Sequence, residues 1–213
     1  MTLSIDLLTV SDFQQNCRIV YDINSKRAIV VDPGGEAHKI ISRLKALGLT
    51  LDGIYLTHSH IDHCGAVAPL FKVLPVPLYG HVAEQAMRQK IIAIAQMYGL
   101  PSESYFNCPE PDVYLEDSME IEVLGVKTKI LSTPGHSPGS ICFWMPSEGL
   151  ILSGDVLFYD SIGRTDLPGG DHETLLASIV KLIKLLPPET KVLSGHGPDT
   201  SIGREKENNP FIN

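Results

Sequence analysis

The sequence predicts an α/β (α+β) protein in which two mixed β-sheets pack face to face and the helices lie on the outside. Each half of the chain runs through several short strands before a helix, and helices are interspersed among the strands of both halves. The 213 residues are 43% hydrophobic and 20% charged, which is enough to bury a sizeable core. We therefore expect one domain that spans residues 1–213, without a linker.

Turn signals divide the first half of the chain into short elements. Apolar runs bounded by glycine, proline or aspartate predict strands, the third of which ends at Asp32-Pro33-Gly34-Gly35. Apolar residues then recur with a helical period until Gly48, which predicts a helix. The expected strands cover 4–10, 18–22, 28–31, 53–56 and 75–79, the expected helices cover 36–47, 63–73 and 82–98, and a loop with three prolines covers 101–111.

The second half is dominated by strands, and glycine or proline separates most of them. A long helix follows, which Asp171 caps and the pair Pro187-Pro188 ends. A last strand and a short terminal helix complete the chain. The expected strands cover 119–123, 126–131, 141–145, 150–152 and 191–193, and the expected helices cover 174–186 and 201–208.

Charge and cysteine usage restrict the class of protein. The formal net charge of −8 argues against a protein that binds nucleic-acid phosphates, which usually carries a basic stripe. No apolar run approaches the roughly 18–20 residues of a membrane span, and the first residues do not resemble a signal peptide. The four cysteines form no Cys-x-x-Cys pair. We therefore expect a cytoplasmic protein with reduced thiols, no membrane or nucleic-acid partner and no obligate protein partner.

Four metal-capable side chains lie within six residues, in the segment His58-x-His60-x-Asp62-His63. The segment follows a predicted strand directly and enters a predicted helix, so Asp62 and His63 should project from the first helical turn. Imidazole nitrogens and carboxylate oxygens suit zinc, iron or manganese, and the absence of thiolate disfavours a structural site rich in cysteine. The segment therefore predicts a metal site.

Three further residues, His136, Asp155 and His196, each lie beside a glycine in a loop or at a strand end in the second half. Glycine lets the backbone approach closely, and functional sites are commonly built from loops at one rim of a sheet. We expect these residues to join the same site. The remaining histidines lack such neighbours, and we interpret them as surface or capping residues: His38, His81 and His172.

The order of these residues resembles that of the metallo-β-lactamase superfamily over essentially the whole chain. Asp155 is similar to the bridging carboxylate of the glyoxalase II branch, where true β-lactamases usually have a cysteine. Residues 161–171 (SIGRTDLPGGD) and 202–211 (IGREKENNPF) resemble the short bacterial glyoxalase-II-like hydrolases of the YcbL type. These proteins are similar to hydroxyacylglutathione hydrolases without the C-terminal helical domain. The resemblance implies an αββα sandwich with two divalent metal ions at one rim.

The resemblance also implies a role for each ligand and a reaction. One ion would be held by His58, His60 and His136, the other by Asp62, His63 and His196, with Asp155 between them. Zinc is the favoured ion, and iron and manganese are compatible. The implied reaction is hydrolysis of a small anionic thioester, S-D-lactoylglutathione, to glutathione and D-lactate in methylglyoxal detoxification. A metal-bridging hydroxide would attack the carbonyl, and the catalytic Asp62 would accept a hydrogen bond from it.

Several alternatives stay open. Arg164 is predicted to contact the anionic end of the substrate, and it could equally form an ion pair with Asp166 or Asp171. The chain also resembles persulfide dioxygenases, which would use a single iron on two histidines and an aspartate, here His58, His136 and Asp155. A hydrolase of another small ester, lactone or thioester, and a binding protein with a vestigial site, are further possibilities. Cys64 is expected to be a small apolar filler rather than a nucleophile.

Overall fold

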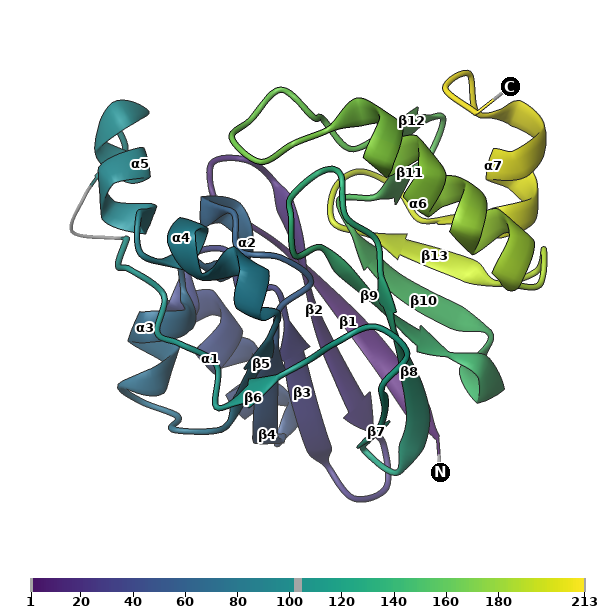
Figure 1. Cartoon of the computed structure of the whole chain (residues 1–213). Helices are drawn as coiled ribbons and strands as arrows, with labels where there is room; N and C mark the ends of the chain where they lie inside the picture. Colours follow the sequence, from purple (N-terminus) through teal and green to yellow (C-terminus); the bar gives the residue numbers. More distant parts are fainter. Residues whose placement is uncertain (1, 102–104, 213) are drawn as a thin grey trace. The chain divides into compact units, whose positions relative to one another are not determined.

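The chain folds as two compact units, the first ending at Tyr114 and the second beginning at Leu115. This is a computed structural model, and it describes residues 2–101 and 105–212. Each unit contains one large mixed β-sheet with helices, drawn in Figure 1, so the predicted pair of mixed sheets is confirmed. We describe each unit by itself.

The sheet of the first unit changes from antiparallel to parallel along its strand order. Among the residues described, its six strands follow the chain from β1 to β6. The first three pair in antiparallel fashion, and β3 begins a series of parallel pairs that continues to the edge strand β6. The strands are β1 (Leu3–Val10), β2 (Gln15–Asp22), β3 (Arg27–Val31), β4 (Thr50–Tyr55), β5 (Leu78–Gly80) and β6 (Val113–Tyr114).

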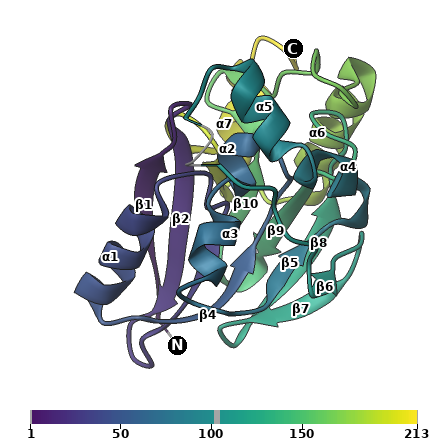
Figure 2. The same cartoon turned by 90° about the vertical axis from the view of Figure 1, so that its left-hand side faces the viewer.

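The parallel pairing of β3 and β4 brings their carboxyl ends to the same edge of the sheet. Asp32 directly follows β3, and the segment that begins at Leu56 follows β4. The helix between the two strands, α1 (Ala37–Leu47), buries Ile40 and Leu44 in the hydrophobic core of this unit. Figure 2 shows α1 in front of the strands of this sheet. The crossover helix thus fixes which residues meet at the sheet edge.

The predicted helix over 63–73 is wrong in its bounds, because the chain forms two shorter helices, α2 (Ile61–Cys64) and α3 (Val67–Phe71). The amide of Ala66 donates to the carbonyl of Pro33 at 2.9 Å instead of continuing the helix. A Cβ atom on Gly34 would lie only 1.3 Å from the carbonyl oxygen of Asp62. The close approach of the segment at Pro33 and Gly34 therefore interrupts the helix.

The single helix predicted over 82–98 is also wrong, since the segment divides into η1 (Val82–Glu84), α4 (Gln85–Arg88) and α5 (Ile91–Met97). The carbonyl of Arg88 accepts from the amide of Cys108 at 3.0 Å, and the amide of Ile92 donates to the side chain of Asn107 at 3.1 Å. These tertiary hydrogen bonds replace helical ones at the break. Of the loop predicted at 101–111, residues 102–104 lie outside the described residues.

The sheet of the second unit is antiparallel except at one pair. Its order is β14-β13-β10-β9-β8-β7 within the part of the chain that the structure describes, and β10 and β13 are its parallel pair. A small separate hairpin, β11–β12, follows β10 along the chain. The strands are β7 (Glu120–Val123), β8 (Val126–Ser132), β9 (Ile141–Met145), β10 (Leu150–Gly154), β11 (Leu157–Phe158), β12 (Ser161–Ile162), β13 (Lys191–Ser194) and β14 (Thr200–Ser201).

Among the described residues, this sheet is accompanied by α6 (His172–Leu185), α7 (Ile202–Asn208) and the short 3-10 turn η3 (Pro146–Glu148). Leu175, Ile179 and Leu182 of α6 are buried against apolar residues of the sheet strands. Asp171 caps α6, because its side chain accepts from the amide of Thr174 at 2.8 Å, as predicted. The terminal helix predicted at 201–208 is confirmed, with Ser201 as its cap.

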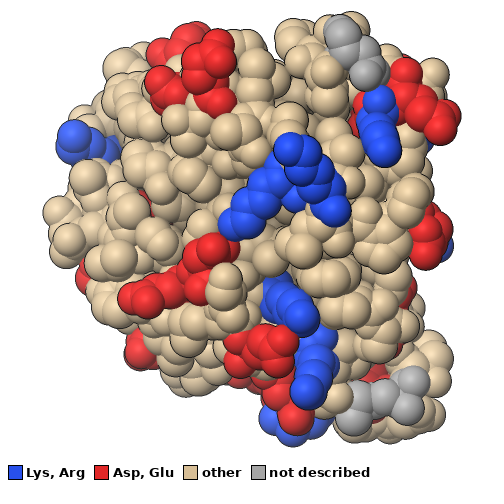
Figure 3. Space-filling view, turned by 45° about the vertical axis from the view of Figure 1, so that its right-hand side comes forward, with Lys and Arg blue, Asp and Glu red and all other residues tan. Residues whose placement is uncertain are grey.

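The surface mixes charges of both signs. Figure 3 shows acidic and basic side chains next to one another in several places. Exposed ion pairs of the second unit have this character, for example Lys181 with Asp117 at 3.0 Å. Over the described ranges, no helix combines the length and the apolarity that crossing a membrane requires. The four cysteines are free and buried: Cys17, Cys64, Cys108 and Cys142.

Candidate metal centre

The first unit brings together the four residues that the sequence singles out in this half of the chain. His58 and His60 lie in the extended segment between β4 and α2, and Asp62 and His63 belong to the single turn of α2. This agrees with the prediction that the last two project from a first helical turn. The three histidines are buried, whereas the side chain of Asp62 is 14% exposed. A buried imidazole needs a partner for each ring nitrogen.

Asp32, which the sequence analysis treats only as a turn residue, is the partner that orients His63. The buried carboxylate accepts the amide and the hydroxyl of Thr57 at 2.8 and 2.6 Å. It also lies 3.0 Å from Nδ1 of His63. A carboxylate can only accept, so Nδ1 carries the proton and Nε2 keeps its lone pair. Nε2 lies 3.9 Å from Oδ2 of Asp62.

The same network fixes the tautomer of His58. The hydroxyl of Thr57 donates its proton to Asp32, so it must accept from Nδ1 of His58, which lies 3.1 Å away. Nε2 of His58 is therefore the nitrogen whose lone pair can accept a hydrogen bond or bind a metal. A ring nitrogen of His58 and a ring nitrogen of His63 belong to one cluster, because the ligand atoms of the two residues are within 4.8 Å of one another. Asp32 thus orients two imidazoles, directly and through Thr57, in a way that would let each Nε2 bind a metal.

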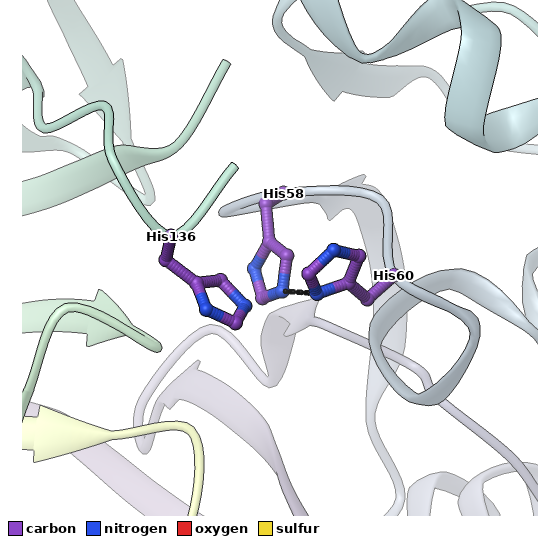
Figure 4. A group of neighbouring side chains, drawn as sticks. All are labelled: His58, His60 and His136. Carbon is purple, nitrogen blue, oxygen red and sulfur yellow. Dashed lines mark hydrogen bonds between the residues drawn. The ribbon is translucent and has the colours of Figure 1, made fainter. Parts of the chain in front are cut away.

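Figure 4 shows the imidazole rings of His58 and His60 facing one another. Nε2 of His58 and Nδ1 of His60 are 3.2 Å apart, and the rings meet edge to face. Two nitrogens bound to one tetrahedral zinc ion at their usual bond lengths are separated by roughly 3.3 Å. The spacing of this pair therefore suits two ligands of the same ion.

Glu84 is a second residue that the sequence analysis missed. Its buried carboxylate accepts a hydrogen bond at 2.9 Å from the amide of Ser59, the residue between His58 and His60. Glu84 belongs to η1, far along the chain from the motif that it contacts. No sequence signal points to this contact, because it depends on where η1 packs.

The second unit brings together His136, Asp155 and His196. His136, also drawn in Figure 4, lies in the loop after β8; Asp155 directly follows β10, and His196 comes shortly after β13. Oδ2 of Asp155 lies 3.6 Å from Nε2 of His136 and 3.5 Å from Nε2 of His196. One carboxylate oxygen is thus nearly equidistant from two imidazole nitrogens, which suits an oxygen that contributes to two metal ions.

The segment after β12 sets the tautomer of His136. Nδ1 of His136 donates to the carbonyl oxygen of Arg164 at 2.8 Å, which leaves Nε2 as the nitrogen that faces Asp155. Gly163 permits this approach. A Cβ atom there would lie 1.9 Å from the carbonyl oxygen of Asp155 and 3.2 Å from Nδ1 of His136.

The side chain of Arg164 pairs with Asp166, one of the two partners predicted for it. Nε and Nη2 of Arg164 donate to the two carboxylate oxygens at 2.7 and 2.6 Å. These hydrogen bonds lower the pKa of Asp166 to about 2. Both side chains are more than half exposed, so the pair contributes little to stability. Asp171 instead caps α6.

The structure gives Cys64 and the remaining histidines the roles expected of them. Cys64 is fully buried, and burial raises the pKa of its thiol well above the usual value, so the thiol stays protonated. This agrees with a small apolar filler. His81 accepts the amide of Ala83 at 3.1 Å as the cap of η1, and His38 and His172 are exposed.

The donors of both units fit divalent metal ions in their chemistry. All seven are imidazole nitrogens or carboxylate oxygens, and three imidazoles have Nδ1 engaged by an oxygen so that Nε2 can bind a metal. Oxygen partners on the outer nitrogen of each ring are the usual arrangement around metal-binding histidines. No sulfur donor is among them. The set suits zinc, iron or manganese.

The chain is similar over its whole length to known proteins of one family. It is 39% identical to the hydroxyacylglutathione hydrolase GloC of Haemophilus influenzae, over 99% of each chain. It is also 40% identical to the probable metallo-hydrolase YqgX of Bacillus subtilis, over 90% of each. Both alignments extend across the two units.

Solved structures agree with this similarity. The crystal structure of the BLEG-1 B3 metallo-beta-lactamase matches with a TM-score of 0.90 and 38% identity, covering 98% of this chain and 99% of that one. TTHA1623, crystallised in a di-iron-bound form, matches with a TM-score of 0.88 and 38% identity over 97% of this chain and 99% of its own. These matches confirm the predicted fold. Residues 10–196 match the family model of the metallo-beta-lactamase superfamily, and the chain therefore belongs to that superfamily.

Proposed function

We propose that the chain is a metal-dependent thioester hydrolase whose best substrate is S-D-lactoylglutathione, which it converts to glutathione and D-lactate. The observation that carries the proposal is the set of preoriented imidazoles: Nδ1 of His58, His63 and His136 is engaged by oxygen, so each Nε2 can bind a metal. A relative of equal length, 39% identical, is a hydroxyacylglutathione hydrolase. The reaction would serve methylglyoxal detoxification.

The proposal includes a binuclear centre formed by ligands from both units of a single domain, 1–213. The superfamily match over residues 10–196 includes both sets of ligands, which supports this assignment. Asp155 would contribute to both ions, and the 3.5 and 3.6 Å distances from its Oδ2 support that role. The first ion would be held by His58, His60 and His136, and the second by Asp62, His63 and His196.

When bound, the two ions would lower the pKa of a shared water, supply hydroxide near neutral pH and polarise the thioester carbonyl. Asp62 would accept a hydrogen bond from the attacking oxygen and so orient its lone pair toward the carbonyl carbon. Because a thiolate leaves readily, the reaction needs no strong general acid. Asp32 would keep His63 in the tautomer that the centre requires.

Arg164 is the proposed contact for an anionic end of the substrate. Its guanidinium already forms two hydrogen bonds with Asp166, so a substrate carboxylate must share or displace that partner. Four free, buried cysteines suit the reducing cytoplasm, where we place the reaction.

Hydrolysis of S-D-lactoylglutathione by the purified, metal-loaded protein tests the proposal. We expect turnover in the wild type, its loss in His60→Ala and Asp155→Ala, and wild-type rates in His172→Ala, which changes an exposed histidine. Lactones, other small esters and a β-lactam are assayed in parallel. Turnover of one of these, with none of the thioester, would retain a metallo-hydrolase and reject the substrate.

Iron-dependent oxidation is the second candidate function. The similarity to TTHA1623, which was crystallised in a di-iron-bound form, supports iron as an alternative metal at this site. A persulfide dioxygenase would need only one iron, on His58, His136 and Asp155. Oxygen uptake with glutathione persulfide, in a preparation with one iron per chain, would favour this reaction over hydrolysis.

A further inference from the structure

The β11–β12 hairpin contacts Ser194 and His196, which lie in one segment of the second unit. The hydroxyl of Ser194, two residues before His196, donates to the carbonyl of Leu157 at 2.8 Å. The ring of Phe158 meets the imidazole of His196 edge to face, with centroids 6.2 Å apart. The hairpin therefore lies against the segment that carries His196.

The two ends of the same hairpin lead to the other two ligands. Asp155 lies two residues before β11, and Arg164, whose carbonyl accepts Nδ1 of His136, lies two residues after β12. Gly163 donates to the carbonyl of Val156 at 3.3 Å, which closes the base of the hairpin. A displacement of the hairpin would thus alter the surroundings of all three ligands.

The C-terminal helix α7 and the residue after it hold this hairpin. The carboxylate of Glu205 accepts the amide of Asp160, in the hairpin turn, at 3.0 Å. The side-chain amide of Asn209 donates to the carbonyls of Ser161 at 3.0 Å and Phe158 at 3.5 Å. Asp160 has a φ of 54°, so the turn is held in the left-handed region that non-glycine residues rarely adopt.

Glu205 is fully buried, and its carboxylate accepts hydrogen bonds from four donors. One oxygen accepts the hydroxyl of Thr200 and Nη1 of Arg204, and the other accepts the amide of Asp160 and the side chain of Asn209. A buried carboxylate is costly unless its lone pairs are all engaged. An apolar residue would pack here at lower cost, so this network needs an explanation beyond stability.

We propose that Glu205 and Asn209 are positioning residues of the metal centre, which hold the β11–β12 hairpin so that His136, Asp155 and His196 are set as ligands. The inference rests on the proposed function, because it requires that these three residues bind metal. Through Glu205 and Asn209, residues 202–211 (IGREKENNPF) would contribute to metal binding. Each acts on these ligands through its hydrogen bonds to the hairpin.

Zinc titration of the metal-free chain against a competing chelator tests the proposal. Glu205→Ala removes the acceptor of the Asp160 amide and should lower zinc affinity about 10- to 100-fold, the usual effect of losing an outer partner of a metal site. Asn209→Ala should act in the same direction. Glu205→Gln keeps one oxygen that can accept from Asp160 and Asn209, so it should restore most of the affinity. Amide exchange at Asp160 should be faster in Glu205→Ala than in Glu205→Gln.

Matched variants separate positioning from general destabilisation. Glu207→Ala and Asn208→Ala make the same changes at exposed positions of α7 and should bind zinc as the wild type does. Met145→Ala changes a buried residue of β9 that pairs with Leu150 and lies outside the hydrophobic cluster containing Leu157 and Ile162, so it destabilises the same unit without altering the packing of the hairpin. At temperatures where its unfolded fraction equals that of Glu205→Ala, it should retain wild-type affinity.

The outcomes are distinguishable. Wild-type affinity in both Glu205→Ala and Asn209→Ala would overturn the positioning role while leaving the metal centre intact. An equal loss in Met145→Ala would also overturn it, because the effect would then be general. A wild-type chain that binds no zinc, iron or manganese would overturn the proposed function itself, and the inference with it.

Discussion

Asp32 and His63 form a buried pair in which the carboxylate holds Nδ1 of the imidazole at 3.0 Å and so directs Nε2 toward Asp62. The same carboxylate fixes His58 through the hydroxyl of Thr57. One residue at the end of β3 therefore controls two imidazoles that follow β4. The parallel pairing of these strands creates this relationship, because it brings their carboxyl ends to one edge.

Asp32→Asn should lower metal affinity about 10- to 100-fold, because an amide cannot accept all three donors and leaves His63 without a fixed tautomer. Asparagine tolerates the φ of 51° at this position, so the substitution should not add backbone strain that would itself change the metal affinity. Asp22→Asn is the control. Its buried carboxylate also accepts three amides, those of Thr2, Asn24 and Ser25, at the far end of β2. Chelator competition should find normal affinity in this control, and equal losses in both variants would contradict the account.

Removal of the Glu84 carboxylate should loosen the segment that carries His58 and His60. Glu84→Ala leaves the buried amide of Ser59 without its acceptor, which should cost about 1–3 kcal/mol in the free energy of unfolding and weaken metal binding. Glu84→Gln retains an oxygen at the same distance and should stay close to the wild type. Chemical denaturation and zinc titration of both variants check this. If the two variants were equally impaired, the hydrogen bond to Ser59 would not be the cause.

Gly163→Ala should disrupt the proposed ligands of the second unit, because the added carbon would lie 1.9 Å from the backbone oxygen of Asp155. Backbone atoms must move to relieve such a contact, so we expect a stability loss of about 1–3 kcal/mol together with weaker metal binding. Gly149→Ala provides the comparison. It has a φ of 62° and open space around it, so it should cost about 1–2 kcal/mol through backbone strain and leave metal binding unchanged. Metal loss in the comparison variant would argue against a local effect.

The ion pair with Arg164 should lower the pH at which the Asp166 carboxyl titrates, and NMR can follow this titration. The folded-state pKa of Asp166 is about 2, below the unfolded value of roughly 3.9, so the pair stabilises the fold above the unfolded pKa and loses this effect as the pH falls toward 2. The contribution is small because both side chains are exposed. At pH 3.5 the carboxyl of Asp166 should be ionised in the wild type and more protonated in Arg164→Gln, which removes the largest cause of the lowered pKa. An unchanged titration in that variant would show that Arg164 is not the cause.

The sequence suggests the seven proposed ligands because each stands at a strand end or in a loop that local signals mark. The HxHxDH segment follows β4, Asp155 follows β10 and His196 follows β13, as expected. Asp32 could have been found by the same rule, since it directly follows β3 beside a proline and two glycines. Short strands of two residues, such as β11 and β12, show no detectable period.

Other features depend on tertiary contacts that no local pattern encodes. The helix break at Gln89 arises because Cys108 takes the carbonyl of Arg88. Glu84 and Glu205 are acidic residues at short helices, where a sequence alone favours exposed side chains. Their burial depends on donors from distant segments, Ser59 for one and Asp160 for the other. Long-range pairings of this kind are the part of the site that only the fold supplies.

The number of metal ions per chain tests the central claim most directly. Elemental analysis of the purified, metal-loaded protein should find two divalent ions per chain, with hydrolysis of S-D-lactoylglutathione by the same preparation. Asp62→Asn removes a ligand of the second ion only and should retain one. A wild-type chain with no more than one ion that leaves the thioester intact would contradict the binuclear hydrolase proposed for these seven residues.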